Sequence, residues 1–460
     1  MNISTPININ GYNADLIISN AMILTMDRNN ELYLSGALAI KGDKIVAVGK
    51  TSRILEKYSA PTVMDGAGKL VMPGLVNTHT HVPMTIFRGY ADDLPLHEWL
   101  YDYIFPIESK FVTKDNVKVG TSLAIAEMLR SGTTTFNDMY YFADEIAKLV
   151  DESGIRAVLC ESVINFPAPN SPTPEDGIRT SEKLIEKWGN HPRISISVGA
   201  HAPYSCSPAL LKRAKALADA YSTPFNIHVA ETLKEFKDSM ERYRLTPVAY
   251  LESLGVLDRN VVIAHGVHLT KDDIEILAQR GVSVAHNPEC NMKLSSGVAP
   301  IPELLKAGVK VGLGTDGAAS NNDMDMLHEM NTAALLQKIT YKDPTVMDAR
   351  TVVEMATIGG AHALGMQNEI GSLEVGKKAD IIMLDLQQPH AHPVYNIYSL
   401  IVYSLKGADV DTVIVDGKIL MTNRRFINLD VVAMYSKVEE LASKIRDHGK
   451  IKNKTGIKKS

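Results

Sequence analysis

Four side chains from three distant parts of the chain are of the types that bind a divalent metal ion. His79 and His81 lie two residues apart in LVNTHTH, His228 lies in FNIHVAE, and Asp316 lies in VGLGTD. Residues i and i+2 of a β-strand project from the same face, so both imidazoles of the pair can face one ion. Three imidazoles and a carboxylate suit Zn²⁺ and leave a position open for water. Iron, nickel and manganese also accept such ligands, so the pattern predicts one divalent ion without fixing its identity.

A His-x-His pair alone is weak evidence, because a chain with 14 histidines among 460 residues contains such pairs by chance. His265 in VVIAHG and Glu231, three residues after His228, extend the pattern. Each histidine has the alternative of being a hydrogen-bonded core residue, and Glu231 that of being a solvated loop acid. They all follow short apolar runs, however, which favours one shared site over separate structural roles. Glu231 is expected to face this site without binding metal.

The elements that must position these residues are short apolar runs that alternate with helical stretches. Helical periodicity is clear in residues 115–132, 208–222 and 270–281. The expected strands are residues 75–81, 133–139, 156–162, 194–201, 225–231, 261–266, 282–287 and 310–316. Such units, repeated over about 300 residues, predict a (β/α)8 TIM barrel. Catalytic residues of this fold lie at the carboxyl ends of the strands, where the metal-binding candidates occur.

Both ends of the chain have a different character. ADLIISNAMILTMD near the start and VDTVIVDGKILMTNRRF near the end read as short strands with polar turns. We therefore predict that residues 1–72 and 370–428 together form a small β-sandwich domain. Residues 73–369 are predicted to form the metal-dependent catalytic barrel, and residues 429–460 a C-terminal helix followed by a basic tail.

Composition indicates a globular protein without a nucleic-acid partner. The net charge is -5 and hydrophobic residues make up 45% of the chain, whereas a nucleic-acid surface needs a basic face. The basic segment KIKNKTGIKKS at the end is expected to be a solvated tail. The three cysteines have no paired spacing, which argues for a reducing compartment. No signal peptide or membrane-spanning run is visible, so a cytoplasmic location is expected.

Two competing motifs are set aside. Gly312, Gly314 and Gly317 form G-x-G-x-x-G, but no acidic residue ends a second strand about 20 residues later, as a dinucleotide site requires. We interpret these glycines as allowing the backbone to approach the metal and the substrate near Asp316. A two-metal site would need a bridging group such as a carboxylated lysine after the fourth strand. That strand ends in His201, so one metal is predicted.

The sequence resembles the amidohydrolase superfamily, and within it the 5-methylthioadenosine/S-adenosylhomocysteine deaminase family, over roughly residues 15–425. The resemblance rests on MPGLVNTHTHVPMTIFRGYADDLPLHEWL, FPIE, GAHAPYSC, NIHVAET, AHGVHL and HNPECNMKLSSGVAPIPELLKAGVKVGLGTDGAASNNDMDML. One departure is Cys290, where the family usually has serine. The resemblance implies that His79, His81, His228 and Asp316 hold one ion, preferably Zn²⁺, with iron, nickel or manganese as alternatives.

The resemblance also implies how a purine nucleoside would be held. Glu108 corresponds to a residue that grips the ribose hydroxyls, and a carboxylate is a suitable acceptor for two vicinal hydroxyls. His201 corresponds to a residue that hydrogen-bonds the purine ring, and Glu231 and Asp316 to residues that contact the reacting part of the substrate. Trp99 corresponds to a residue that lines the adenosine pocket; its alternative is a packed helix aromatic.

The implied reaction is hydrolytic deamination. Asp316 and His265 would orient water and accept its proton, while Glu231 would donate a proton to the ring nitrogen beside carbon 6. The products would be the inosine analogue and ammonia. The expected substrate is a small adenosine thioether, 5′-methylthioadenosine or S-adenosylhomocysteine. Arg156 and Arg179 are candidates for binding a homocysteine carboxylate.

Two alternatives remain open at this point. The first is another aminohydrolase of the same barrel, acting on adenosine, 5′-deoxyadenosine, guanine, a pterin or a triazine. Glu108 distinguishes nucleoside substrates from free bases, because a free base has no ribose for its carboxylate to hold. The second is a non-catalytic scaffold. A suitable residue is present at every expected metal-ligand position, which argues against this alternative. Analogy with the family suggests a homo-oligomer.

Overall fold

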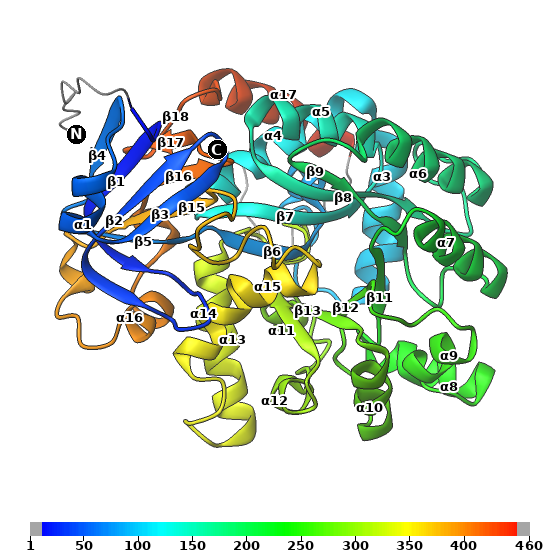
Figure 1. The fold of residues 1–460 in the computed structure, drawn as a ribbon. Helices are drawn as coiled ribbons and strands as arrows, with labels where there is room; N and C mark the ends of the chain where they lie inside the picture. Colours follow the sequence, from blue (N-terminus) through cyan, green and yellow to red (C-terminus); the bar gives the residue numbers. More distant parts are fainter. Residues whose placement is uncertain (1–11, 449–460) are drawn as a thin grey trace, which may run out of the picture.

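The structure, a computed structural model, describes residues 12–448 and contains a barrel and a separate β-sheet (Figure 1). The barrel strands run in the order β14-β13-β12-β11-β10-β8-β7-β6, with the short β9 paired to β8. They are β6 (Leu75–Thr80), β7 (Thr133–Tyr140), β8 (Arg156–Val163), β9 (Ile194–Ile196), β10 (Val198–Ala200), β11 (Phe225–Val229), β12 (Val261–His265), β13 (Ser283–His286) and β14 (Lys310–Leu313). All eight expected strands are confirmed, the fourth being divided into β9 and β10.

The described barrel strands pair in parallel, and two hydrogen bonds near the mouth join the first strand to the last. The Thr78 hydroxyl donates to the Leu313 carbonyl at 2.8 Å, which joins β6 to β14. The backbone N–H of Asp316 donates to the carbonyl of His79 at 3.0 Å. The first and last strands, and with them the metal-binding candidates of both, are therefore held side by side.

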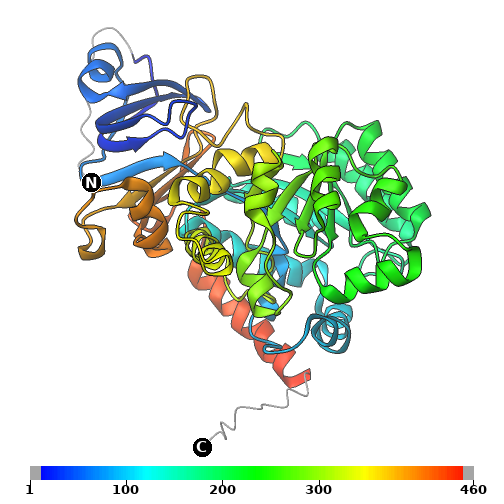
Figure 2. The ribbon, with the colours of Figure 1, turned by 90° about the horizontal axis from the view of Figure 1, so that it is seen from below.

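Helices cover the outside of the barrel strands (Figure 2). They are α4 (Lys114–Arg130), α5 (Ala143–Ser153), α6 (Pro174–Trp188), α7 (Pro208–Ala220), α8 (Leu233–Tyr243), α9 (Pro247–Ser253), α10 (Lys271–Arg280), α11 (Pro288–Lys293), α12 (Ile301–Lys306), α13 (Met326–Tyr341), α14 (Ala349–Ala356) and α15 (Ile358–Ala363). The three expected helical stretches are confirmed as α4, α7 and α10. In α10, Thr270 and Asp273 form a reciprocal capping box, and Gly281 closes the helix at φ +70°.

An irregular segment separates β6 from α4 and covers the barrel mouth. It consists of η1 (Val82–Phe87), α2 (Leu96–Glu98), the π-helix η2 (Trp99–Ile104) and α3 (Phe105–Phe111). Trp99 and Glu108 lie in this segment, so two of the residues expected to contact substrate are not carried by barrel strands.

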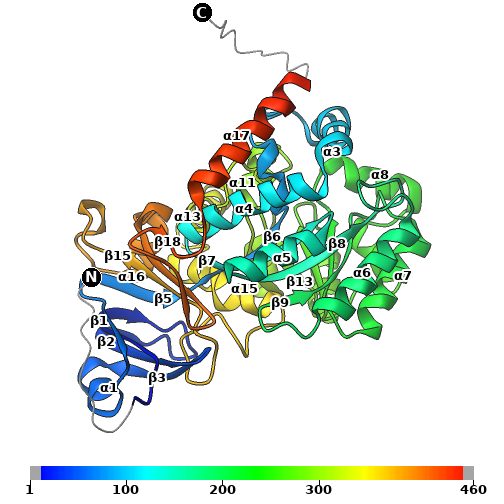
Figure 3. The same cartoon turned by 90° about the horizontal axis from the view of Figure 1, so that it is seen from above.

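The second part is a sheet built from both ends of the chain, as predicted (Figure 3). Its order is β18-β17-β16-β15-β5-β1-β2-β3, with β4 paired to β1, and β5 joins the two ends by pairing antiparallel to β15. The strands are β1 (Leu16–Leu24), β2 (Leu32–Lys41), β3 (Lys44–Lys50), β4 (Thr62–Asp65), β5 (Lys69–Pro73), β15 (Ile381–Asp385), β16 (Val410–Val415), β17 (Lys418–Thr422) and β18 (Arg425–Phe426). The accompanying helices are α1 (Thr51–Lys57), η3 (Pro389–Ala391), α16 (Ile397–Tyr403), η4 (Gly407–Asp409) and α17 (Val431–His448).

The barrel and the sheet meet at a short connection and at a buried ion pair. Only Gly74 separates β5 from β6, and a Cβ at that position would lie 2.1 Å from Thr134 Oγ1, so no larger residue fits. Arg156, which opens β8, donates to both carboxylate oxygens of Asp380 at 2.7 and 3.1 Å and to Asp416 at 3.0 Å. The sheet is therefore tied to the amino-terminal end of the barrel, away from the mouth.

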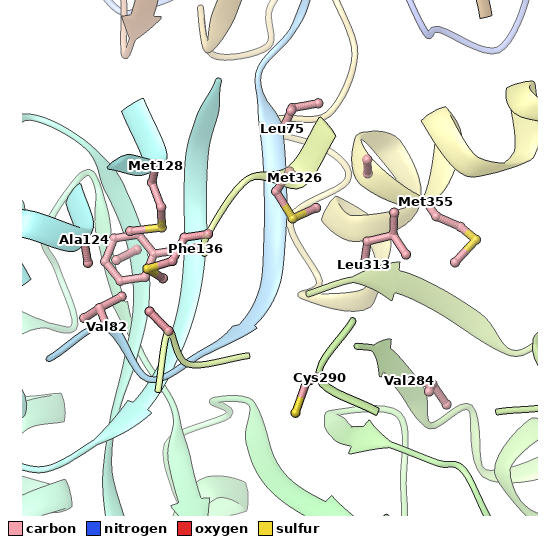
Figure 4. Close-up of a cluster of buried hydrophobic side chains, with 14 of the residues drawn as sticks. Leu75, Val82, Ala124, Met128, Phe136, Val284, Cys290, Leu313, Met326 and Met355 are labelled. Carbon is pink, nitrogen blue, oxygen red and sulfur yellow. The ribbon is translucent and has the colours of Figure 1, made fainter. Parts of the chain in front are cut away.

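The apolar core lies between the strands and the outer helices. Figure 4 shows Phe136 of β7 among Val82, Ala124 and Met128, so that η1, α4 and the second strand pack together. α17 lies along α4 and buries Met434, Leu441 and Ile445. Within residues 12–448, no helix is both long and apolar enough to cross a membrane. The predicted basic tail lies outside the described residues.

Candidate metal centre and substrate cavity

The four candidate metal ligands meet at the mouth of the barrel. His79 Nε2 and His81 Nε2 lie 3.4 and 3.2 Å from Asp316 Oδ1. His228 Nε2 lies 3.3 Å from His81 Nε2, and the ring centroids of His79 and His228 are 4.8 Å apart. Residues separated by more than 200 positions in the chain thus present their donor atoms to one small volume, as the sequence pattern predicted.

The donor atoms fit a cation better than they fit one another. His79 Nε2 and Asp316 Oδ1 are both buried, and neither has a hydrogen-bond partner among the described residues. Leaving buried polar atoms unpaired is costly, and a divalent ion would satisfy both. The donor set of imidazole nitrogens and one carboxylate oxygen suits Zn²⁺. Among the described residues, no lysine lines the inner cavity.

Hydrogen bonds behind the cluster orient two of the rings. His81 Nδ1 donates to the Met139 carbonyl at 2.5 Å, and His228 Nδ1 donates to the His201 carbonyl at 2.6 Å. Each bond places the proton on Nδ1 and leaves Nε2 available as a ligand. The second carboxylate oxygen of Asp316 accepts from Cys290 Sγ at 2.7 Å and from Ser320 Oγ at 2.9 Å. Cys290 therefore supplies a donor where serine is usual in the family.

Burial and the nearby carboxylate set the charge state of the cluster. Burial lowers the pKa of His79 to about 4 and holds the pKa of His228 well below its ordinary value. Burial alone would lower the pKa of His81, but the nearby Asp316 carboxylate and the Met139 carbonyl together outweigh it and raise the pKa of His81 to about 9. Since ligands bind metal in their deprotonated form, a cation would take the place of the extra proton on His81.

The backbone is strained where the strands end. Ala230, His265 and Asp316 have φ of +55°, +73° and +61°, a region that residues other than glycine rarely adopt. Such strain concentrates at functional sites. Gly314 allows the backbone to approach the cluster closely, because a Cβ at this position would lie 2.8 Å from the backbone nitrogen of His79. The glycine-rich segment thus allows close backbone approach to the metal cluster, as we interpreted it.

Glu231 and His265 face each other beside the cluster. His265 Nε2 lies 3.8 Å from Glu231 Oε2, and its Nδ1 is 2.9 Å from Asn291 Oδ1. Burial raises the pKa of Glu231. Glu235 accepts from the backbone N–H groups of Ala230 and Glu231 at 2.9 and 2.8 Å and so fixes the loop that carries Glu231. Glu231, the candidate acid, and His265, a candidate base, therefore face the same part of the cavity.

The residues expected to contact substrate line the same cavity. Glu108 is 5% exposed and accepts from the Tyr140 hydroxyl at 2.5 Å. Burial raises the pKa of Glu108 to about 7, although this hydrogen bond opposes the shift. His201 Nδ1 is 2.7 Å from Ser205 Oγ, and burial lowers the pKa of His201 to about 3. Trp99 is buried and also lines the cavity.

These side chains surround an inner cavity of about 80 Å³. It joins an outer chamber of about 480 Å³ through the shared lining residues Leu96, Leu100, Tyr204, Glu231 and Leu294. Apart from the two arginine candidates, every expected site residue except His79 lines the inner cavity, and His79 Nε2 lies 3.4 Å from Oδ1 of the lining residue Asp316. The structure thus brings together the candidate metal ligands, the candidate acid and base, and the residues expected to contact the nucleoside.

The two arginines proposed for a carboxylate lie elsewhere. Arg156 is buried in the ion pair with Asp380 and Asp416, and Arg179 is exposed on α6, where it pairs with Asp176. Neither lines the inner cavity or the outer chamber. The sequence also did not reveal Tyr140, Ser320 or Glu235, since their roles depend on hydrogen bonds formed only after folding.

Comparison with known proteins adds an independent observation. A model described as the amidohydrolase family matches residues 70–420. A Syntrophobacter fumaroxidans protein named 5-methylthioadenosine/S-adenosylhomocysteine deaminase is 47% identical over 433 residues, which are 94% of this chain and 99% of that protein. The deaminase 1 of the same name from Syntrophus aciditrophicus is 43% identical over 95% of this chain and 98% of its own length.

A solved structure is similar over the same range. The crystal structure of an adenosine deaminase from Xanthomonas campestris with bound zinc superposes with a TM-score of 0.93 at 38% identity. The match covers 94% of this chain and 99% of that chain. A zinc ion is therefore present in a protein of closely similar fold.

Proposed function

Because the chain belongs to the amidohydrolase family, we propose that it is a metal-dependent aminohydrolase acting on the adenine ring of adenosine thioethers. It converts 5′-methylthioadenosine or S-adenosylhomocysteine to the inosine analogue and ammonia. The observation that carries this proposal is the inner cavity, where a cluster of metal-binding side chains, an acid–base pair and a buried carboxylate for the ribose face one another.

We assign the metal site to His79, His81, His228 and Asp316, and we propose zinc as the ion. The unpaired buried atoms of His79 and Asp316 support this assignment. A divalent ion bound there would lower the pKa of water toward the neutral range and so supply a nucleophile.

The other residues perform the proton transfers. Glu231, whose pKa is raised by burial, donates a proton to the ring nitrogen beside carbon 6 and makes that carbon electrophilic. His265 and Asp316 accept a proton from the water that adds to carbon 6. The proton then passes to the departing amino group, the carbon–nitrogen bond breaks, and ammonia leaves. Carbon 6 keeps the oxygen as a carbonyl when the proton of its hydroxyl group returns to Glu231, so one water is consumed for each ammonia released.

Glu108, His201 and Trp99 of the cavity lining bind the substrate and exclude water. Glu108, oriented by Tyr140, accepts from the ribose hydroxyls, and His201 hydrogen-bonds the purine ring. Trp99 supplies apolar surface beside the nucleoside. These contacts would hold carbon 6 at the metal cluster and would favour a nucleoside over a free base.

Ammonia release by the purified, metal-loaded protein tests the proposal. The substrates to compare are 5′-methylthioadenosine, S-adenosylhomocysteine, 5′-deoxyadenosine, adenosine and guanine. We expect turnover of the adenosine thioethers, and we expect Glu108→Gln to raise their KM. Turnover of guanine without deamination of any thioether would overturn the proposal.

A further inference from the structure

The inner cavity is too small for the nucleoside that the proposed function requires. Its volume is about 80 Å³, whereas pockets that hold small molecules usually measure about 300–1,000 Å³. Glu108, His201 and Asp316, which are expected to contact a bound nucleoside, line this cavity and do not line the outer chamber. The nucleoside therefore cannot lie in the outer chamber instead, and part of the cavity wall must move when it binds.

The part of the wall that can move is the segment before α3. Residues 90–104, which we call the lid segment, comprise a loop, α2 and the π-helix η2. Leu96, Trp99, Leu100 and Ile104 of this segment line the inner cavity, and Leu96 and Leu100 also line the outer chamber. Movement of the lid segment would therefore enlarge the cavity without disturbing the barrel strands.

Few polar contacts hold the lid segment in place. In the described chain, its backbone forms no hydrogen bond with a barrel strand or with any residue beyond α3. Asp92 is the only side chain of the segment that hydrogen-bonds to another part of the described chain. Gly89 and Asp93, at φ of +68° and +59°, lie on either side of this contact. Segments held by so few contacts open more readily than the strands that they cover.

Asp92 is held by residues of two elements that also support the metal cluster. Lys293 Nζ donates to Asp92 Oδ1 at 2.5 Å and to Asn322 Oδ1, and Asn322 Nδ2 donates to Asp92 Oδ2 at 3.2 Å. Lys293 ends α11, whose Cys290 donates to Asp316. Asn322 lies in the loop that follows Asp316. The three side chains thus tie the lid segment to the elements that orient Asp316.

We propose that the lid segment opens to admit the nucleoside and that Lys293 is the positioning residue that holds it closed. The structure is that of the closed state, in which Trp99 and Ile104 are buried at the cavity wall. The side chains of Lys293 and Asp92 are 23% and 32% exposed, so loss of their ion pair should shift the lid segment toward the open state about fivefold or less. This inference rests on the proposed function, because a nucleoside is the ligand that the closed cavity cannot admit.

Fluorescence of Trp99 reports the position of the lid segment. The chain has two tryptophans, so Trp188→Phe gives a parent protein in which Trp99 is the single reporter. In the metal-loaded full-length parent, acrylamide should quench Trp99 weakly, because its indole is buried. Adding Lys293→Ala should raise the quenching constant about two- to fivefold, since the segment is open more often. Adding Lys293→Arg should restore the parent value, and Lys306→Ala, which removes an exposed lysine from α12, should leave it unchanged.

A cross-link tests whether the lid segment must open. The native cysteines of the described chain are buried, and the side chains of Asp92 and Asn322 approach to 3.2 Å. Dibromobimane, a short bifunctional thiol reagent, should therefore bridge the double variant Asp92→Cys, Asn322→Cys. Bridging should lower kcat/KM for 5′-methylthioadenosine and for S-adenosylhomocysteine about tenfold or more relative to the same variant before treatment. Treatment of Asn322→Cys alone should leave its kcat/KM unchanged.

The outcomes separate the lid, the role of Lys293 and the proposed function. Unchanged turnover of the bridged enzyme would overturn the lid. Equal quenching of Trp99 in the parent and in Lys293→Ala would overturn the role of Lys293. Absence of deamination before bridging would instead refute the proposed function, and the quenching comparison would still decide whether Lys293 holds the segment closed.

Discussion

Each side chain at the mouth of the barrel depends on a neighbour that fixes its orientation. Backbone carbonyls hold Nδ1 of His81 and of His228, and Cys290 and Ser320 hold one oxygen of Asp316. Backbone N–H groups tie Glu231 to Glu235. The meeting of the four candidate metal ligands could be predicted from their types and spacing. These supporting contacts could not, because they join residues that the sequence does not relate to one another.

Glu231→Gln separates acid catalysis from metal binding. The glutamine side chain cannot donate the proton that Glu231 supplies, so kcat should fall by about 10²–10⁴-fold. The metal content of Glu231→Gln should stay at that of the unmodified protein, because Glu231 is not assigned as a ligand. His79→Ala should lose both metal and activity. Steady-state rates and elemental analysis of the same samples check this. A fully active Glu231→Gln would show that the proton comes from another group.

The burial of His286 predicts that the free energy of unfolding depends on pH. It ends β13, is fully buried, and neither ring nitrogen has a partner among the described residues. Burial lowers its pKa to about 3, whereas the unfolded value is about 6.5. Below pH 6.5 the unfolded chain therefore takes up a proton that the folded chain refuses until about pH 3, and stability falls as the pH falls.

The comparison with His286→Asn isolates this effect. Between pH 7 and pH 5 the unfolding free energy of the unmodified protein should fall by roughly 2 kcal/mol more than that of the variant. Denaturant titrations at both pH values measure it. Parallel pH dependence in the two proteins would contradict the assignment of a neutral, unpaired imidazole.

At the scale of elements, the regular part of the molecule was predictable and the irregular part was not. The barrel strands are short apolar runs that end in polar residues, a pattern visible without any contact information. Residues 82–113 lack such periodicity and form η1, α2, the π-helix η2 and α3. Their conformation depends on packing over the barrel mouth. The positions of Trp99 and Glu108 in the site could therefore be inferred only from a family resemblance.

The junction between the barrel and the sheet depends on the ion pair of Arg156. Asp380→Ala leaves a buried guanidinium with only Asp416, so the unfolding free energy should fall by about 3–5 kcal/mol. The exposed pair Arg280–Glu252 provides the control, and Glu252→Ala should cost less than about 1 kcal/mol. Denaturant titration of both variants checks the difference. Equal small losses would show that the pair does not stabilise the junction.

At the scale of the whole molecule, we propose that the barrel, residues 73–369, and the sheet from residues 1–72 and 370–428 are two domains. α17 then returns to the barrel, packing along α4 and contacting η1, the segment that directly follows His81. The C-terminal helix is thus placed to stabilise the region behind the metal cluster.

Truncation tests this role of α17. A chain that ends at residue 430 loses the burial of Met434, Leu441 and Ile445, so its unfolding free energy should fall by roughly 3–6 kcal/mol. A chain that ends at residue 448 keeps the helix and should match the full-length protein. Chemical denaturation of the three proteins provides the measurement. Equal stability of all three would show that α17 contributes nothing to the barrel.

The central claim is that one divalent ion joins the first, fifth and eighth barrel strands. Anomalous diffraction at the zinc edge from crystals of the zinc-loaded protein tests it directly. We expect one peak per chain at the barrel mouth, with the nearest atoms of His79, His81, His228 and Asp316 at about 2.0–2.2 Å. A second metal peak bridged to the first, or a single ion out of reach of His228 or Asp316, would contradict it.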